Sequence, residues 1–257
     1  DVPESHAPAI HHVHEQNTPG SIDVVVAGGG IGGLCTALVL LKMGYNVKVF
    51  EKTKQYRPFG GPIQVASNAA ESIRRIDEGV YERILEKATV IGNRINGLKD
   101  GLSDEWFATF DLDSPARKRG QVSSVVIDRP ILQEILLERV GHTVTNDAEV
   151  ISCETIGDRV RVQLSNGDSV DGDILVGSDG INSRVRDVFD PLRRAPVWSG
   201  YTCVAGMAYV VPPDIKEVGY KVWVGARKYF GGGMAIEDAL VLGQEIKKLT
   251  DDHPEPK

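Results

Sequence analysis

The sequence is poor in cysteine and carries no excess of positive charge. Its three cysteines, Cys35, Cys153 and Cys203, lie far apart in a chain of 257 residues, which excludes a disulfide framework or a CxxC pair. A reducing compartment is therefore expected. The formal net charge of -7 argues against nucleic acid as a partner, because phosphate binding requires a basic face. The length allows one large domain or two small ones.

The sequence also lacks a clear membrane span and a cluster of metal ligands. Residues 24–41 carry no charge, but they contain five glycines, which break a helix, so a strand, a turn and a packed helix are expected there instead of a transmembrane helix. Residues 1–21 are polar, show no signal peptide and are expected to form a disordered tail. Four histidines of this tail have no Cys or carboxylate cluster to complete a metal site: His6, His11, His12 and His14.

A glycine motif follows the tail. The continuous apolar run from Val24 to Ala27 predicts a buried parallel strand, and residues 31–43 predict a helix that stops at Gly44. Between them stands the spacing Gly28-x-Gly30-x-x-Gly33. In a Rossmann unit the first glycine permits the tight turn, the second lets the backbone approach a pyrophosphate, and the third lets helix and strand pack closely. The start of the helix offers N–H groups and a positive dipole end to phosphates.

An acidic residue completes the dinucleotide-binding pattern. Val47 to Phe50 predict a second strand, which ends at Glu51, 18 residues beyond Gly33. A carboxylate at that place can accept hydrogen bonds from ribose hydroxyls and would repel a 2′-phosphate, so NADP is disfavoured at this site. The motif alone does not decide whether the cofactor is FAD or NAD.

The remaining pattern predicts an α/β fold. Helices are expected at residues 67–77 and 80–88, and a hairpin at 93–112, with Asn96-Gly97 or Asp100-Gly101 as its turn. A strand at 122–127 precedes a helix that begins near Asp128 and runs to about Arg139. Further strands are expected within 144–176, at 198–211 and at 220–224, and a last helix at 234–249.

Several later motifs resemble a known class of flavoproteins. Residues 173–180, Asp-Ile-Leu-Val-Gly-Ser-Asp-Gly, with Ser183 and Arg186 after them, resemble the second fingerprint of the FAD-dependent aromatic hydroxylases, and Val126-Ile127-Asp128-Arg129 resembles their arginine-bearing helix start. More narrowly, the chain is similar to the zeaxanthin epoxidases of plants and algae from about Ile22 to Phe230. The blocks that carry this similarity are residues 55–57, 61–64, 67–69, 92–98 and 199–203.

The resemblance implies an FAD-dependent, NADPH-consuming monooxygenase that delivers one atom of O₂ to a carotenoid double bond, with no protein nucleophile and no metal. It implies eight cofactor-binding residues: Gly28, Gly30, Gly33, Glu51, Arg57, Arg129, Asp179 and Gly180. Two alternatives stay open. Arg129 can be a surface residue at a helix start, and Asp179-Gly180 can be a plain turn between a strand and a helix.

The chain departs from this class near its end. Residues 230–233, Phe-Gly-Gly-Gly, join directly to Met234, without the Gly-Asp segment of the third fingerprint and without much of the sheet that covers the substrate. The chain therefore resembles a member with an internal deletion, and weak or uncoupled oxygenation is expected. The alternatives are a catalytically impaired relative that serves as a structural or binding subunit, for instance of a photosynthetic complex, and a truncated gene model or splice form.

These observations predict a Rossmann-type FAD-binding domain and a smaller, truncated mixed β-sheet substrate domain. The first comprises residues 22–92, 120–186 and 231–250, the second 93–119 and 187–230, and residues 251–257 form a tail. The resemblance implies a plastid location, in the stroma or at the thylakoid surface. It also implies an apolar polyene or carotenoid substrate and allows protein-complex partners and peripheral membrane contact.

Overall fold

The chain forms two compact units. The computed structural model describes residues 22–58, 60–92, 94–190, 192, 195–200, 221–225 and 228–232. The first unit comprises Asp1–Gln55 and Leu136–Arg194, and the second Tyr56–Ile135 and Ala195–Lys257. The expected tails at 1–21 and 251–257, nearly all of the expected strand at 198–211 and the expected helix at 234–249 lie outside the described residues. The division into a cofactor domain and a substrate domain stays a prediction.

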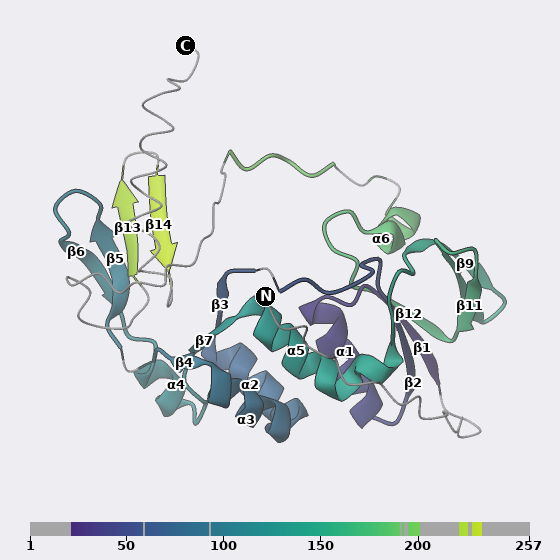
Figure 1. Ribbon diagram of the computed structural model, residues 1–257, viewed down its shortest axis with the longest axis horizontal. Helices are drawn as coiled ribbons and strands as arrows, with labels where there is room; N and C mark the ends of the chain where they lie inside the picture. Colours follow the sequence, from purple (N-terminus) through teal and green to yellow (C-terminus); the bar gives the residue numbers. More distant parts are fainter. Residues whose placement is uncertain are drawn as a thin grey trace, which may run out of the picture. The chain divides into compact units, whose positions relative to one another are not determined.

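A parallel sheet is the centre of the first unit, with strand order β12-β1-β2-β8 among the described residues (Figure 1). Its strands are β1 (Asp23–Ala27), β2 (Asn46–Phe50), β8 (Val144–Thr145) and β12 (Ile174–Gly177). Strand β1 lies between β2 and β12, and its residues from Val24 to Ala27 are buried. This burial on both faces confirms the parallel strand that the uninterrupted apolar run predicts.

Helix α1 (Ile31–Lys42) returns the chain from β1 to β2 and packs against both strands (Figure 1). Its buried side includes Leu34, Ala37 and Leu38. The helix ends where Gly44 adopts a φ of +84°, a conformation that favours glycine, as the sequence predicts. In the described part of the chain, none of the helices combines the length and apolar character that a membrane crossing requires.

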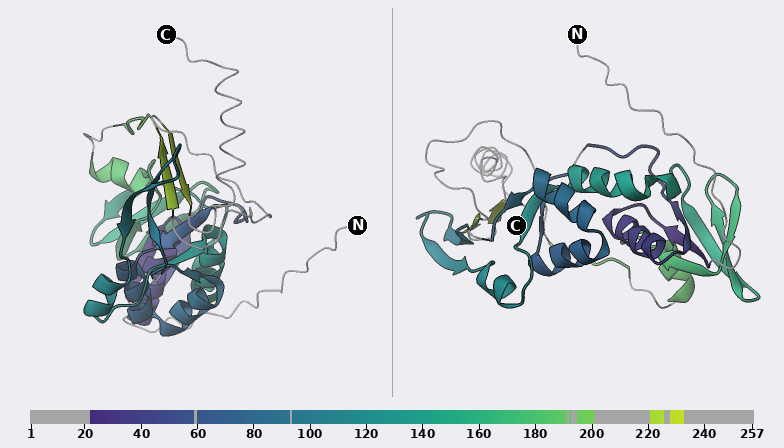
Figure 2. Two further views of the ribbon diagram at one scale, coloured as in Figure 1. Left: turned by 90° about the vertical axis from the view of Figure 1, so that its left-hand side faces the viewer. Right: turned by 90° about the horizontal axis from the view of Figure 1, so that it is seen from below.

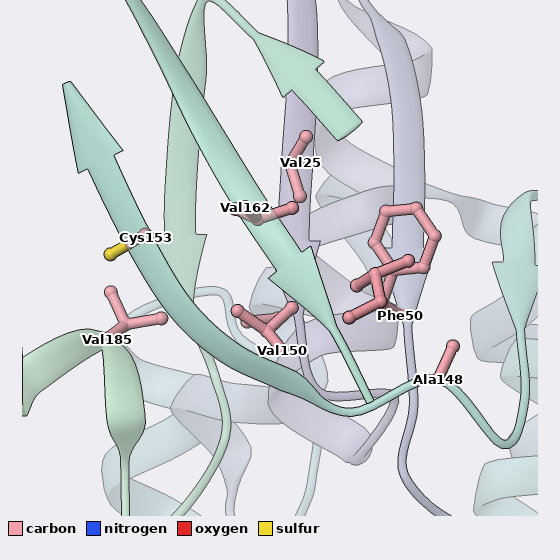
Figure 3. Packing of buried hydrophobic residues seen from close by; sticks show 9 residues of the cluster. Val25, Phe50, Ala148, Val150, Cys153, Val162 and Val185 are labelled. Carbon is pink, nitrogen blue, oxygen red and sulfur yellow. The ribbon is translucent and has the colours of Figure 1, made fainter. Parts of the chain in front are cut away.

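A second, antiparallel sheet completes the core of the first unit. It has the order β11-β10-β9 and consists of β9 (Val150–Ile156), β10 (Arg159–Leu164) and β11 (Ser169–Gly172). Figure 3 shows Val150 and Val162 of this sheet packed with Val25 and Phe50 of the parallel sheet and with Val185 of helix α6 (Arg184–Phe189). A short 3-10 helix, η1 (Gly141–Thr143), precedes β8.

The second unit contains an antiparallel sheet of order β3-β7-β4 and a pair of helices. The strands are β3 (Pro62–Val65), β4 (Thr89–Val90) and β7 (Val125–Asp128), and the helices are α2 (Ser67–Ile76) and α3 (Glu78–Lys87). The two helices pack on each other (Figure 2). Their bounds lie within two residues of those that the sequence predicts. Helix α5 (Arg129–Val140) follows β7 directly; it begins in the second unit and ends in the first.

A further sheet of the second unit has the order β14-β13-β5-β6. It consists of β5 (Asn96–Asp100), β6 (Trp106–Phe110), β13 (Lys221–Gly225) and β14 (Lys228–Gly232), and α4 (Ser114–Lys118) follows β6. The hairpin between β5 and β6 turns at Asp100-Gly101, whose Asp100 carboxylate accepts hydrogen bonds from the N–H groups of Leu102 and Ser103. Asn96-Gly97 lies inside β5, so the turn is the second of the two dipeptides that the sequence offered.

Candidate functional site

The turn between β1 and α1 can be formed only with glycine at two of its positions. Gly28 has a φ of +100°, and a β-carbon placed on it would lie 2.4 Å from the carbonyl oxygen of Ser178. A β-carbon on Gly33 would lie 1.9 Å from the carbonyl oxygen of Gly28. Real β-carbons do not approach backbone atoms so closely, so any side chain there would force the strand, the turn and the helix apart. Gly28 and Gly33 are therefore required for the steric reason that the sequence predicts for a dinucleotide-binding turn.

The outer side of the same turn is open. β-carbons on Gly30 and Gly32 would meet no atom within 4 Å. Gly30 is the N-cap residue of α1 and has no side chain that could bond the first N–H groups, and the first turn of the helix holds no acidic residue. The first N–H groups of a helix have no partner within the helix, and the dipole makes this end positive. The turn thus fits a diphosphate, which needs free backbone donors and room for a close approach.

Glu51 lies beside this turn. It is buried, with 8% of its surface exposed, and its Oε2 accepts a hydrogen bond of 2.7 Å from the N–H of Gly29. Its Oε1 accepts one of 2.8 Å from the N–H of Thr53. The backbone of Glu51 is fixed as well, because its N–H donates to Thr145 and its carbonyl accepts from Ala148. The acid at the end of β2 is therefore held next to the glycine turn, while its binding of ribose stays a prediction.

Asp179 and Gly180 follow β12 on the other side of β1. The Ser178 N–H donates to the carbonyl of Ala27 at 2.7 Å, which ties this loop to the end of β1. The Asp179 Oδ2 accepts from the N–H groups of Arg184 and Val185 at 2.6 and 3.2 Å, so this carboxylate caps the start of α6. Its Oδ1 is buried and has no hydrogen-bond partner within the described residues. The Gly180 φ of +82° marks a turn.

The two predicted arginines lie in the second unit, whereas the other six predicted site residues lie in the first. Arg57 is exposed, in the segment before β3. Arg129 is exposed at the start of α5, and its N–H donates to the carbonyl of Gly61 at 3.4 Å. A β-carbon on Gly60 would lie 3.2 Å from the β-carbon of Arg129, so this glycine lets the segment pass close to the helix start. The roles of both arginines stay predictions.

Sequence reasoning missed the residues that contribute only backbone atoms to the site. Thr53 holds the Glu51 carboxylate through its N–H, and Ser178 faces Gly28 through its carbonyl. Every residue carries a backbone carbonyl, and every residue except proline carries an N–H, so neither position leaves a signal in the side-chain pattern.

No reactive thiol or metal cluster accompanies the site in the part of the chain that the structure describes. Burial raises the pKa of the Cys35 thiol. Burial, and after it the charge of Asp179, raises the pKa of the Cys153 thiol. A thiol with a raised pKa is a poor nucleophile. Among the described residues no group of three or more His, Cys, Asp or Glu side chains could hold a metal ion.

Comparison with known proteins places this geometry among flavoproteins. Residues 21–196 match the family model described as an FAD binding domain. The chain is 46% identical to the chloroplastic zeaxanthin epoxidase of Prunus armeniaca over 228 residues, which are 84% of this chain and 34% of that protein. It is 47% identical to that of Spinacia oleracea over 221 residues, 82% of this chain and 32% of that protein. The chain thus spans about a third of the length of these relatives.

Two solved structures share the fold of this chain. The Klebsiella pneumoniae HpxO complexed with FAD and uric acid superposes with a TM-score of 0.65 at 25% identity, over 84% of this chain and 54% of that one. The tetrameric form of 2-methyl-3-hydroxypyridine-5-carboxylic acid oxygenase superposes with a TM-score of 0.56 at 22% identity, over 66% of this chain and 42% of that one. The α/β fold with a Rossmann-type unit, expected from the sequence, is confirmed.

Proposed function

The chain belongs to the family of FAD binding domains, and on this premise we propose that it is the cofactor-binding part of an NADPH-dependent monooxygenase that epoxidises a carotenoid such as zeaxanthin. The observation that carries the proposal is the open glycine turn at the start of α1, with the buried Glu51 hydrogen-bonded to it. The identity of 46% to a zeaxanthin epoxidase supports the substrate class.

FAD is the cofactor, and its adenosine diphosphate half fits the first unit. The backbone at Gly28, Gly30 and Gly33 and the first N–H groups of α1 would hold the pyrophosphate, and Glu51 would accept hydrogen bonds from the ribose hydroxyls. Four further residues complete the predicted set and would contact the cofactor or NADPH: Arg57, Arg129, Asp179 and Gly180. FAD supplies the activation of O₂ when it is bound, and NADPH supplies the electrons.

The protein's own part in this chemistry is binding, orientation and exclusion of water. A polyene offers no charged group, so its position must be set by apolar contacts, and the reacting centre must be kept dry. No side chain is assigned as a catalytic acid, base or nucleophile.

The second candidate is a catalytically impaired relative that serves as a structural or binding subunit, for instance in a photosynthetic complex. The direct joining of residues 230–233 to Met234, without a Gly-Asp segment, favours it. Without that segment the ribityl part of FAD would lose a carboxylate partner, and without the neighbouring strands water would reach the flavin. Under this candidate any FAD that binds supports NADPH oxidation to hydrogen peroxide instead of epoxide formation.

We propose a plastid location, in the stroma or at the thylakoid surface. The names of the relatives, which are called chloroplastic, support the plastid. Peripheral contact with a membrane would give access to a lipid-soluble substrate. In the first unit Ile181, Phe189 and Leu192 are 69%, 70% and 88% exposed, which agrees with such contact. Flotation of the purified chain with galactolipid vesicles tests this point; a chain that stays entirely in the aqueous fraction contradicts it.

A turnover experiment separates the two candidates. The purified chain is incubated with FAD, NADPH, air and zeaxanthin in micelles, and epoxide, NADPH and hydrogen peroxide are measured, with a mixture lacking FAD as control. The active enzyme gives about one epoxide for each NADPH consumed. The impaired relative gives NADPH oxidation with little epoxide. A chain that takes up no FAD contradicts the active enzyme and favours the structural or binding subunit.

A further inference from the structure

Two successive N–H groups tie the glycine turn to the end of β2. The N–H of Gly28 donates to the carbonyl of Phe50 at 2.8 Å, and the N–H of Gly29 donates to the Glu51 Oε2 at 2.7 Å. The first of these hydrogen bonds joins two backbone groups, so it does not depend on the side chain of either residue. The second needs a side chain that reaches from residue 51 to residue 29 and accepts a hydrogen bond there.

We propose that Glu51 is a positioning residue that sets the shape of the glycine turn before any cofactor binds, in addition to its proposed contact with the ribose. The inference rests on the proposed function only for the identity of the ligand. The hydrogen bonds that carry it belong to the chain itself.

Both oxygens of the Glu51 carboxylate already accept a backbone N–H. Oε2 faces Gly29 and Oε1 faces Thr53 at 2.8 Å, and the side chain is buried. Each carboxylate oxygen has two acceptor positions, so one remains on each oxygen for a ligand. Two remaining acceptors match two neighbouring ribose hydroxyls. A 2′-phosphate is mostly a dianion at neutral pH, so it offers almost no donor and would be repelled by the carboxylate.

This arrangement requires a carboxylate and tolerates no amide. Glutamine has the same shape, but it offers one acceptor oxygen and one NH₂ group. With N–H donors converging from Gly29 and Thr53, the NH₂ group of glutamine would have to face one of them. One buried N–H would then lose its acceptor, whichever way the amide is turned. Aspartate carries the same carboxylate on a side chain one methylene shorter, so from position 51 it would not reach the N–H groups of both Gly29 and Thr53.

Fixing the turn in advance has a functional consequence. Glycine has more backbone freedom than any other residue, and residues 28–30 are three glycines in a row. A turn that is ordered only when the ligand arrives lowers the affinity by the cost of ordering it. The bond from Gly29 to Glu51 removes part of that freedom in the cofactor-free chain, so the phosphate cradle exists before FAD enters.

Amide hydrogen exchange of the cofactor-free chain tests the proposal without FAD. In the wild-type chain the amide of Gly29 should exchange at least about tenfold more slowly than that of Gly32, whose N–H lies in the first turn of α1 and has no partner within the helix. Equal rates at the two glycines would overturn the proposal. This comparison needs no variant, so it holds even if a substitution prevents folding.

The variant Glu51→Gln sharpens the test. It should speed exchange about tenfold or more at Gly29 or at Thr53, whichever N–H then faces the NH₂ group, whereas Glu51→Ala should speed exchange at both. The matched control is Glu71→Gln, which alters another buried carboxylate, in the second unit, and should leave exchange at Gly29 unchanged. The proposal is contradicted if Glu51→Gln keeps wild-type protection within about twofold at both Gly29 and Thr53, or if Glu51→Ala keeps it at Gly29.

A binding measurement separates the two roles of Glu51. Stopped-flow mixing with FAD should show slower association for Glu51→Ala than for the wild type, because the turn is no longer formed in advance. An unchanged association rate with faster dissociation would indicate ribose contact alone and would refute the positioning role. A chain that protects Gly29 but binds no FAD would refute the proposed function and leave this inference intact.

Discussion

Gly33 faces Gly28 at a distance that leaves no room for a side chain, since a β-carbon on Gly33 would lie 1.9 Å from the carbonyl oxygen of Gly28. The helix and the strand that carry the site can approach each other only because residue 33 is glycine. The close contact is between backbone atoms, and it explains why the third glycine of the motif is needed although it does not line the open side of the turn.

Replacement of Gly33 by valine should therefore damage both stability and cofactor binding. Overpacking of a closed contact costs about 1–3 kcal/mol of the free energy of unfolding. Urea unfolding of the cofactor-free chain measures the first effect, and a flavin fluorescence titration measures the second, with a loss of about tenfold or more in affinity. The control is Gly141→Ala, because a β-carbon there would lie 3.8 Å from Leu137, an ordinary contact.

The charge of Glu51 should select against a 2′-phosphate. ADP-ribose and 2′-phospho-ADP-ribose differ only in that group, and the unphosphorylated compound should displace FAD about tenfold or more effectively. In Glu51→Ala the difference between the two compounds should shrink, because the repelling charge is gone. Competition titrations with flavin fluorescence measure both. Equal displacement by the two compounds in the wild type would contradict the predicted role of this acid.

Glu71 should make the second unit sensitive to acid. Hydrogen bonds from Arg74 and then Arg75 lower the pKa of the Glu71 carboxyl from 4.5 to about 2. A lowered pKa in the folded state contributes stability above the unfolded pKa, and this contribution is lost as the pH falls from about 4.5 towards 2. Acid unfolding followed by circular dichroism should show a flatter pH dependence over that range for Glu71→Gln. The control Glu82→Gln alters an exposed carboxylate of α3 and should keep the wild-type slope.

Asn96 should be a stabilising residue of the second unit. Its side chain is fully buried, and its Nδ2 donates to the carbonyls of Ile91 and Arg94, both at 2.8 Å. Asn96→Ala would leave these carbonyls without that donor and should lower the free energy of unfolding by about 1–3 kcal/mol. Chemical denaturation measures the change, and Asn68→Ala, at an exposed position of α2, is the control. Equal stability of the two variants would count against the assigned role.

The same asparagine shows where the sequence was ambiguous. Asn96-Gly97 and Asp100-Gly101 are both dipeptides that favour tight turns, and only two residues lie between them. The tertiary structure decides between them, because the Asn96 side chain is used to bond two carbonyls in the interior and Gly97 lets the chain pass the carbonyl of Ala108. Neither contact is visible in the local pattern.

The dinucleotide-binding turn could be predicted because it depends on apolar side chains in the strand and on glycines at fixed positions, and both are visible in the sequence. Val24 to Ala27 are apolar because both faces of β1 are buried, and Gly28 and Gly33 are required by contacts that exclude a β-carbon. The partner of Glu51 at Thr53 could not be predicted, since it contributes a backbone N–H that almost every residue carries. The second N–H on this carboxylate, from Gly29, depends on the close approach of β1 and β2, which sequence spacing only suggests.

The most direct test of the account is a titration of the cofactor-free chain with FAD, followed by the absorbance and fluorescence of the flavin. The account predicts that one FAD binds per chain, that the sample turns yellow, and that Gly33→Val binds far more weakly than Gly141→Ala. A wild-type chain that stays colourless at saturating FAD, or a Gly33→Val variant that binds FAD as tightly as the wild type, would contradict it.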